Sequence, residues 1–190
     1  MAIKLAVTGE IRSGKNAFCD YIQSMVPNME QLYFAKGIEE IIRKYFPEAY
    51  EGNEKPRKYF QDIGQMLRTV NPEVWVNQVA EQYNWSSSES FICTDLRQPN
   101  EYEWLKSEGF TVVKIEADAD IRITRMALAG DSFTPESLNH PVEQQIRNLP
   151  WDWRVINNGT LEQLHEQADI ILQQLRIQEE FTQIRLKGAM

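Results

Sequence analysis

The sequence is poor in the residues that mark several large classes of protein. Only two of its 190 residues are cysteine and two are histidine, so we expect neither a disulfide framework nor a zinc site. Cys19 and Cys93 each fall inside a predicted core element, where reduced, structural thiols are expected. The protein is therefore predicted to be cytoplasmic.

Long apolar runs and excess positive charge are also missing. No stretch approaches the roughly 18–20 apolar residues of a membrane span, and the apolar run at 3–8 is too short for a secretory leader. The formal net charge is −8, whereas broad nucleic-acid-binding surfaces usually carry an excess of Lys and Arg. We thus expect no membrane partner and no nucleic-acid partner, while a small basic pocket for one phosphorylated molecule stays compatible with this charge.

What the sequence does contain is an alternation of short apolar runs with helical patterns. Strands are predicted at 3–8, 31–34, 91–94, 110–115 and 153–156, and amphipathic helices fill most of the intervals. This alternation is typical of a parallel sheet covered by helices. The segment 129–150 is polar without a clean period, so we predict a mobile insert there. The length fits a single domain.

The most specific motif follows the first predicted strand. Residues 9–16 read Gly-Glu-Ile-Arg-Ser-Gly-Lys-Asn, which matches the phosphate-loop pattern G-x-x-x-x-G-K. The glycines let backbone N–H groups curl around phosphate oxygens, the next helix adds the partial positive charge of its N-terminus, and Lys15 reaches the β- and γ-phosphates. A chance turn would lack the strand before it and the amphipathic helix after it. The predicted nucleotide-binding residues of the loop are Gly9, Arg12, Ser13, Gly14, Lys15, Asn16 and Ala17.

Asn16 departs from the usual pattern, in which a Ser or Thr hydroxyl binds Mg²⁺ directly. An amide carbonyl also suits a hard cation, but this longer side chain can act through water. Asp95 follows the apolar run 91–94, and ligands of open α/β sheets lie beyond the carboxyl ends of strands. Asn16 and Asp95 are the predicted metal ligands; the alternative for Asp95 is a helix cap or a partner for Arg97.

Several segments beyond the loop resemble those of phage-type deoxynucleoside monophosphate kinases, within the P-loop nucleoside monophosphate kinase group. The resemblance runs from residue 3 to about residue 164. Its carriers are Tyr-Phe-Ala-Lys at 33–36, Arg-Lys-Tyr-Phe-Gln at 57–61 with Gly64 and Arg68, Trp75 with Val76, Thr-Asp-Leu-Arg at 94–97 with Pro-Asn-Glu at 99–101, His140 with Pro141 and Glu143, and Ile-Asn-Asn-Gly-Thr at 156–160. A dephospho-coenzyme A kinase has a similar plan and is the nearest competing relative.

The resemblance implies an α/β three-layer sandwich with a five-stranded parallel sheet flanked by helices. It further implies a helical monophosphate-binding region at about 35–85 and a lid insert at about 129–150. By the same resemblance, Asn157 and Gly159 would contact the donor's adenine, although a simple turn and helix cap explains them equally well. The implied substrate-binding residues are Phe34, Arg43, Arg57, Gln61, Arg68, Trp75 and Arg97; for the two aromatic residues a core role is the alternative.

Arginines are the candidates for the positive charge that phosphoryl transfer requires. Arg122 and Arg125 lie three residues apart on the helix that leads into the insert, so they share a face, although a solvated surface would look the same. Arg97 suits bidentate binding of a substrate phosphate, or a surface ion pair. Together with Lys15 and Asp95, these arginines form the predicted catalytic set.

The sequence therefore predicts a kinase that uses ATP and Mg²⁺ to phosphorylate a (deoxy)nucleoside monophosphate, giving the diphosphate. Two alternatives stay open at this point. One is a kinase for another small acceptor such as dephospho-coenzyme A, and the other is a nucleotide-binding P-loop domain without turnover. The expected partner is a small-molecule nucleotide substrate, for a protein that is a monomer or a homodimer.

Overall fold

The computed structural model of the chain describes residues 2–51, 56–82, 90–130 and 141–188. It separates into two compact units. The sheet unit comprises Met1–Gln31 and Ser86–Met190, and the helical unit comprises Leu32–Trp85. Within the described ranges, no helix is both long enough and apolar enough to cross a membrane.

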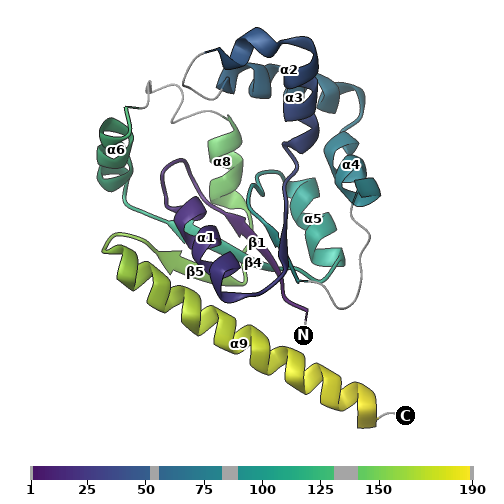
Figure 1. The fold of residues 1–190 in the computed structure, drawn as a ribbon, viewed down its shortest axis with the longest axis vertical. Coiled ribbons are helices and arrows are strands. Elements are labelled where there is room, and N and C mark those ends of the chain that lie inside the picture. The colour runs from purple at the N-terminus through teal and green to yellow at the C-terminus, as the bar shows by residue number, and fades with distance from the viewer. Residues whose placement is uncertain (1, 52–55, 83–89, 131–140, 189–190) are drawn as a thin grey trace. The chain divides into compact units, whose positions relative to one another are not determined.

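A five-stranded sheet in the order β2-β3-β1-β4-β5 forms the centre of the sheet unit (Figure 1). β1 (Lys4–Thr8) pairs in parallel with β3 (Ser90–Cys93) on one side and with β4 (Thr111–Glu116) on the other. β5 (Trp153–Ile156) continues the parallel pairing beyond β4, and β2 (Met29–Leu32) forms the opposite edge. All four residues of β3 are buried, as expected for a strand covered on both faces. The predicted five-stranded parallel sheet is confirmed.

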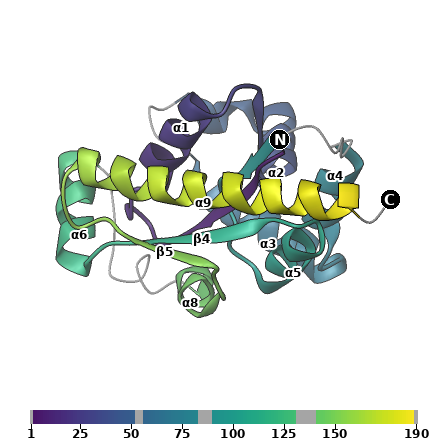
Figure 2. The same ribbon diagram turned by 90° about the horizontal axis from the view of Figure 1, so that it is seen from below.

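Helices cover both faces of this sheet. Figure 2 shows α1 (Lys15–Met25) and α9 (Leu161–Gly188) on one face, with α5 (Pro99–Ser107) and α8 (Pro141–Asn148) on the other. α6 (Ala119–Leu128) follows β4. The two helices of the first face bury their apolar stripes on the strands in one continuous core, which includes Leu5, Val7, Phe18, Ile22, Val113, Leu164, Ala168 and Leu172.

Two helix starts show how local hydrogen bonds set the boundaries. The Thr160 N–H donates to Gln163 Oε1 at 3.0 Å and the Gln163 N–H donates to Thr160 Oγ1 at 3.3 Å, so these two residues cap the start of α9. α5 begins at Pro99, after a capping box formed by Gln98 and Glu101. The Glu101 carboxylate accepts the N–H of Gln98 at 3.0 Å, and Pro99, which has no N–H to satisfy and a fixed φ, takes the first helical position.

α8 is the main departure from the expected order of elements, because it lies in the segment 129–150, for which the sequence predicts no regular structure. Pro141 begins this eight-residue helix, and Ile146 and the following Leu149 are buried. Residues 143–148 are polar apart from Ile146, so the sequence shows no clean apolar periodicity there. The part of the insert at 131–140 lies outside the described residues.

The helical unit consists of α2 (Lys36–Tyr45), the short 3₁₀ helix η1 (Pro47–Tyr50), α3 (Arg57–Val70) and α4 (Val74–Gln82). Its buried side chains come from all three α-helices. The Trp75 indole N–H donates to the Gly64 carbonyl at 3.3 Å, which ties α4 to α3. The buried apolar residues of this unit are Leu32, Phe34, Ile38, Ile42, Ile63, Trp75, Val76 and Val79.

Candidate active site at the phosphate loop

The loop between β1 and α1 needs glycine at both ends for steric reasons. A Cβ on Gly9 would meet the backbone oxygen of Ile115 on the neighbouring strand β4. Gly14 has a φ of 103°, and a Cβ there would meet the side-chain amide of Asn157. Between them, Arg12 has a φ of 58°, a conformation that costs energy for a residue with a side chain and that is found mainly at functional sites. The surrounding strands thus dictate the path of the loop.

Polar groups inside the loop are arranged for an anion. Lys15 Nζ donates to the carbonyl oxygens of Gly9 and Glu10, at 2.7 and 2.9 Å, and so spans the loop. The hydroxyl of Ser13 is buried and has no hydrogen-bond partner among the described residues. The first turn of α1 contains no acidic residue, so the partial positive charge at its N-terminus is not offset there. Phosphate oxygens would satisfy these groups, and the residues present fit a polyphosphate.

Arg125 and Asn157 hold the back of the loop. The Arg125 guanidinium donates to the carbonyl of Arg12 at 3.4 Å and to the carbonyl of Asn157 at 3.0 Å. Asn157 is buried, and its amide donates to the Ser13 carbonyl at 2.8 Å. Asn157 therefore braces the loop in this structure, which is a different use from the predicted contact with adenine. Gly159 lies beside the side chain of Gln163, at the start of α9.

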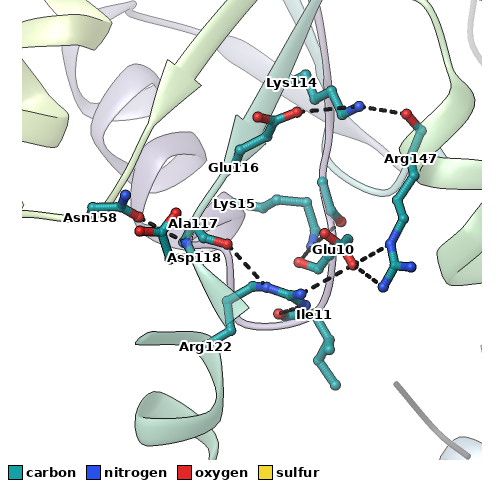
Figure 3. Close-up of polar contacts among 11 residues, drawn as sticks. Glu10, Ile11, Lys15, Lys114, Glu116, Ala117, Asp118, Arg122, Arg147 and Asn158 are labelled. Carbon is teal, nitrogen blue, oxygen red and sulfur yellow. Dashed lines mark hydrogen bonds and ion pairs between the residues drawn. The ribbon is translucent and has the colours of Figure 1, made fainter. Parts of the chain in front are cut away.

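A cluster of charges surrounds Glu10, the second residue of the loop (Figure 3). Arg122 of α6 donates to the carbonyls of Ala117 at 3.2 Å and Ile11 at 3.5 Å, and its Nη2 pairs with Glu10 Oε1 at 3.2 Å. Arg147 of α8 approaches the same oxygen with both Nε and Nη2 at 2.8 Å. The structure thus brings Arg122 and Arg125 together at the loop, as their helical spacing predicts.

Arg147 and Glu10 are the residues that the sequence reasoning missed. The position of Glu10 is variable in the loop pattern, so the motif gives it no role. Arg147 belongs to a helix that was not predicted. The only signal in the sequence was Glu10 itself, because an acidic residue inside an anion-binding loop requires a compensating cation nearby.

A second charged chain connects Arg147 to the sheet. Lys114 of β4 is buried, and its Nζ donates to the Arg147 carbonyl at 2.7 Å and pairs with Glu116 Oε1 at 3.3 Å. Arg154 of β5 pairs with the other oxygen of Glu116 at 2.7 Å. Partial burial alone would raise the pKa of Glu116, but the hydrogen bonds from Arg154 and Lys114 outweigh it and hold this pKa below its ordinary value.

The predicted metal ligands lie at the ends of two elements of the sheet unit. Asn16 is exposed in the first turn of α1, and Asp95 is half-buried just after β3. The hydroxyl of Thr8 donates to the Leu96 carbonyl at 2.8 Å, which ties the end of β1 to the turn after β3. Within the described ranges, no group of three or more His, Cys, Asp and Glu side chains is placed to hold a metal ion. Mg²⁺ is usually bound through one or two carboxylates plus phosphates and water, so a site for this ion does not require such a group.

Arg97 follows Leu96 in the turn after β3. Its side chain is exposed, while its backbone N–H donates to the Glu101 carboxylate at 3.0 Å. The turn is thus fixed by the start of α5, and the guanidinium extends from a firmly held backbone.

The remaining candidates belong to the helical unit. Arg43 pairs with Glu39 and lies over the ring of Tyr50, with its guanidinium carbon 4.3 Å from the ring centroid, so it takes part in a surface ion pair. Phe34 and Trp75 are 2% and 3% exposed and match the core alternative. Arg57 and Gln61 lie exposed in the first half of α3, and Arg68 is half-buried in its last turn.

Comparison with known proteins places this geometry among kinases of known structure. No family model and no curated protein sequence matches the chain. A protein of Thermus thermophilus shares the fold with a TM-score of 0.57 and 20% identity, over 92% of this chain and 98% of that one. A gluconokinase from Sinorhizobium meliloti gives 0.54 and 16% over 95% and 97%. The shikimate kinase from Aquifex aeolicus gives 0.55 and 15% over 92% and 99%. Taken with the five-stranded parallel sheet and the loop between β1 and α1, these similarities show that the chain has the α/β fold of P-loop kinases.

Proposed function

We propose that this protein transfers the γ-phosphoryl group of ATP to the phosphate of a (deoxy)nucleoside monophosphate, giving the diphosphate. The observation that carries the proposal is the convergence of cations on one loop. Lys15 spans its carbonyls, and Arg122 and Arg125 reach it from α6. Loop amides and one lysine suffice to bind phosphates, whereas additional arginines are what phosphoryl transfer needs as negative charge shifts during the reaction.

The roles of the residues follow from their positions. The loop amides and the N-terminus of α1 bind the β- and γ-phosphates, and Lys15 exchanges its two carbonyl contacts for phosphate oxygens. Arg125 keeps the loop in place through the Arg12 carbonyl. Arg97, beyond the carboxyl end of β3, binds the acceptor's phosphate. No covalent intermediate is required, because positioning and charge neutralisation account for the catalysis of this reaction.

Mg²⁺, when bound, supplies charge neutralisation to the transferring phosphates. Asn16 and Asp95 are the residues that would hold it, through an amide carbonyl and a carboxylate. Both residues lie near chain turns that other contacts fix: Asn16 follows the braced loop, and Asp95 precedes the Leu96 carbonyl that Thr8 holds.

Support for a nucleotide acceptor comes from the sequence resemblance and from the basic and polar residues of α3. Arg57, Gln61 and Arg68 are the proposed contacts for the monophosphate, in the helical unit. The alternative is a kinase for another small acceptor, and the solved neighbours include a gluconokinase and a shikimate kinase. A panel assay of ATP consumption against nucleoside monophosphates, dephospho-coenzyme A, gluconate and shikimate separates the two, and activity with none of them would indicate a binding domain without turnover.

We also propose a cytoplasmic location, on the chemistry of the two thiols. Both cysteines are buried and unpaired in disulfides. Burial raises the pKa of Cys19 to about 12 and that of Cys93 well above its ordinary value. Thiols of this kind do not form the thiolate that disulfide exchange requires at neutral pH.

The lid at about 129–150 and the choice between a monomer and a homodimer stay predictions.

A further inference from the structure

One carboxylate oxygen of the phosphate loop serves two arginines from two different helices. Glu10 Oε1 lies 3.2 Å from Arg122 Nη2 and 2.8 Å from both Nε and Nη2 of Arg147. The side chains of Glu10 and Arg122 are 20% and 10% exposed, whereas that of Arg147 is 45% exposed. Glu10 is thus an acidic residue inside an anion-binding loop, and its carboxylate holds two arginines there.

The two arginines differ in what remains for a ligand. Arg122 is nearly buried and already donates to the carbonyls of Ala117 and Ile11, so it ties α6 to the loop. Arg147 makes contact with the carboxylate through two of its three nitrogens, and among the residues that the structure describes its Nη1 has no partner. Its backbone is fixed as well, because Lys114 Nζ donates to its carbonyl at 2.7 Å. Arg147 therefore has a held position and an available donor.

Charge explains why a carboxylate is tolerated here. An isolated Glu10 would repel a bound triphosphate. With Arg122 and Arg147 the cluster carries two positive charges and one negative charge, so its net charge is +1. The carboxylate also restrains a long side chain that is almost half exposed and would otherwise sample many conformations.

We propose that Glu10 is a positioning residue that holds Arg147 of α8 against the phosphate loop, where Arg147 binds the terminal phosphate of the donor. This inference rests on the proposed phosphotransfer function. It differs from a competing role for Glu10, in which the carboxylate occupies the arginines and has to be displaced by phosphate. If Glu10 positions Arg147, Glu10→Gln should reduce the effect of Arg147→Gln on phosphate binding. If the carboxylate competes with phosphate, Glu10→Gln should tighten phosphate binding.

The test measures tripolyphosphate binding by calorimetry for the wild type, Glu10→Gln, Arg147→Gln and the double variant. We expect Arg147→Gln to weaken binding about tenfold in the presence of Glu10, as loss of a charge-assisted contact to phosphate does. In the Glu10→Gln background the same change should weaken binding less than about twofold, because the arginine is no longer held at the loop. Lys106→Gln removes an ion pair with Asp152 in the same sheet unit, outside the chain of contacts to Arg147, and serves as the control, with unchanged binding expected.

Two results would overturn the inference. Equal effects of Arg147→Gln in both backgrounds would mean that Glu10 does not position the arginine, and tighter binding by Glu10→Gln would mean that the carboxylate competes with phosphate. Tripolyphosphate needs no acceptor, so this outcome is independent of whether the acceptor panel finds turnover. With an acceptor that is turned over, Glu10→Gln should raise the KM for ATP about tenfold, as the lost phosphate contact requires, and leave the KM for the acceptor nearly unchanged, a split that general destabilisation does not produce. Circular dichroism verifies that all variants are folded.

Discussion

Lys15 is the residue on which phosphate binding depends most directly. Its ammonium group spans the carbonyls of Gly9 and Glu10 and contributes nothing to the apolar core. We predict that Lys15→Ala lowers ATP affinity about 10- to 100-fold, the range for one charged hydrogen-bonded contact, and leaves the fold intact. Calorimetry with ATP and far-ultraviolet circular dichroism measure the two effects.

The control for this change is Lys58→Ala. Lys58 is an exposed lysine of α3 that pairs with Asp62 at 2.7 Å, so its loss also removes one positive charge from the surface. Its ATP affinity should equal that of the wild type. Wild-type affinity of Lys15→Ala for ATP, together with native ellipticity, would contradict the assignment of the phosphate loop.

Asn16 occupies the position where a hydroxyl usually meets the metal. The side chain is exposed in the first turn of α1, so a substitution there disturbs no packing. We predict that Asn16→Ser keeps or modestly raises the rate of phosphoryl transfer, because a short hydroxyl places its oxygen directly on Mg²⁺. The measurement is the initial rate as a function of Mg²⁺ concentration for both proteins. A large loss of activity in Asn16→Ser would show that the amide has a specific role of its own.

At the scale of secondary-structure elements, Gly9 is where β1, the loop and β4 come closest. A methyl group there would collide with the Ile115 carbonyl of β4, so either the strand pair or the loop has to move. We predict that Gly9→Ala lowers the free energy of unfolding by about 2–4 kcal/mol, the range of a strongly destabilising core change, and weakens ATP binding. Urea unfolding and calorimetry measure the two quantities.

Gly109 provides the matched control for backbone strain alone. Its φ is +82°, and a Cβ there would meet no atom within 4 Å. Gly109→Ala should therefore cost only about 1–2 kcal/mol, for an L-residue in the left-handed region, and leave ATP binding unchanged. Equal losses in the two variants would contradict the steric account of Gly9.

The ion pair between β4 and β5 makes stability depend on pH. The folded-state pKa of Glu116 lies below its ordinary value of 4.5, so its contribution is present above that value and is lost as the pH falls through the folded-state pKa. We predict that Arg154→Gln lowers the free energy of unfolding by about 0.3–1 kcal/mol at pH 7, since the pair is partly exposed. In urea titrations this difference should shrink towards zero as the pH falls below 4.5 and through the folded-state pKa, and a constant difference would contradict the role of Glu116.

The elements were predictable where packing and local hydrogen bonds agree with sequence pattern. The five strands lie within two residues of their predicted positions. β1, β3 and β4 are short, mainly apolar runs that the pattern locates directly, whereas β2 (Met-Glu-Gln-Leu) is half polar and starts two residues earlier than predicted. α8 was missed because residues 143–148 are polar apart from Ile146 and show no clean apolar period. Leu161 is apolar but 57% exposed, because the cap at Thr160 sets the phase of the helix so that Leu164 is the first buried residue.

At the scale of the whole molecule, the loop was the most predictable part of the site, since a short motif contains both the glycines and the lysine. The residues that brace the loop could not be predicted, because they come from α6, from α8 and from the turn after β5. They meet the loop only in the folded chain. Asn157 shows this best: the sequence suggests a ligand contact, and the structure uses its amide to hold the Ser13 carbonyl. Long-range hydrogen bonds of this kind leave no periodic trace in a sequence.

The fold itself leaves the acceptor open, because kinases with different acceptors share it. The named neighbours include a gluconokinase and a shikimate kinase. A nucleoside monophosphate is proposed as the acceptor because of the sequence resemblance and the basic and polar residues of α3. The identity of the acceptor is therefore the part of the proposal that most needs an experimental test.

The most direct measurement is the rate of ATP-dependent product formation with Mg²⁺ across all common ribo- and deoxyribonucleoside monophosphates, dephospho-coenzyme A, gluconate and shikimate. Lys15→Ala serves as the background in every reaction. We predict that at least one nucleoside monophosphate is converted to its diphosphate by the wild type, and that Lys15→Ala abolishes most of this activity. Turnover of a non-nucleotide acceptor alone, or tight ATP binding with no product from any acceptor, would contradict the proposal.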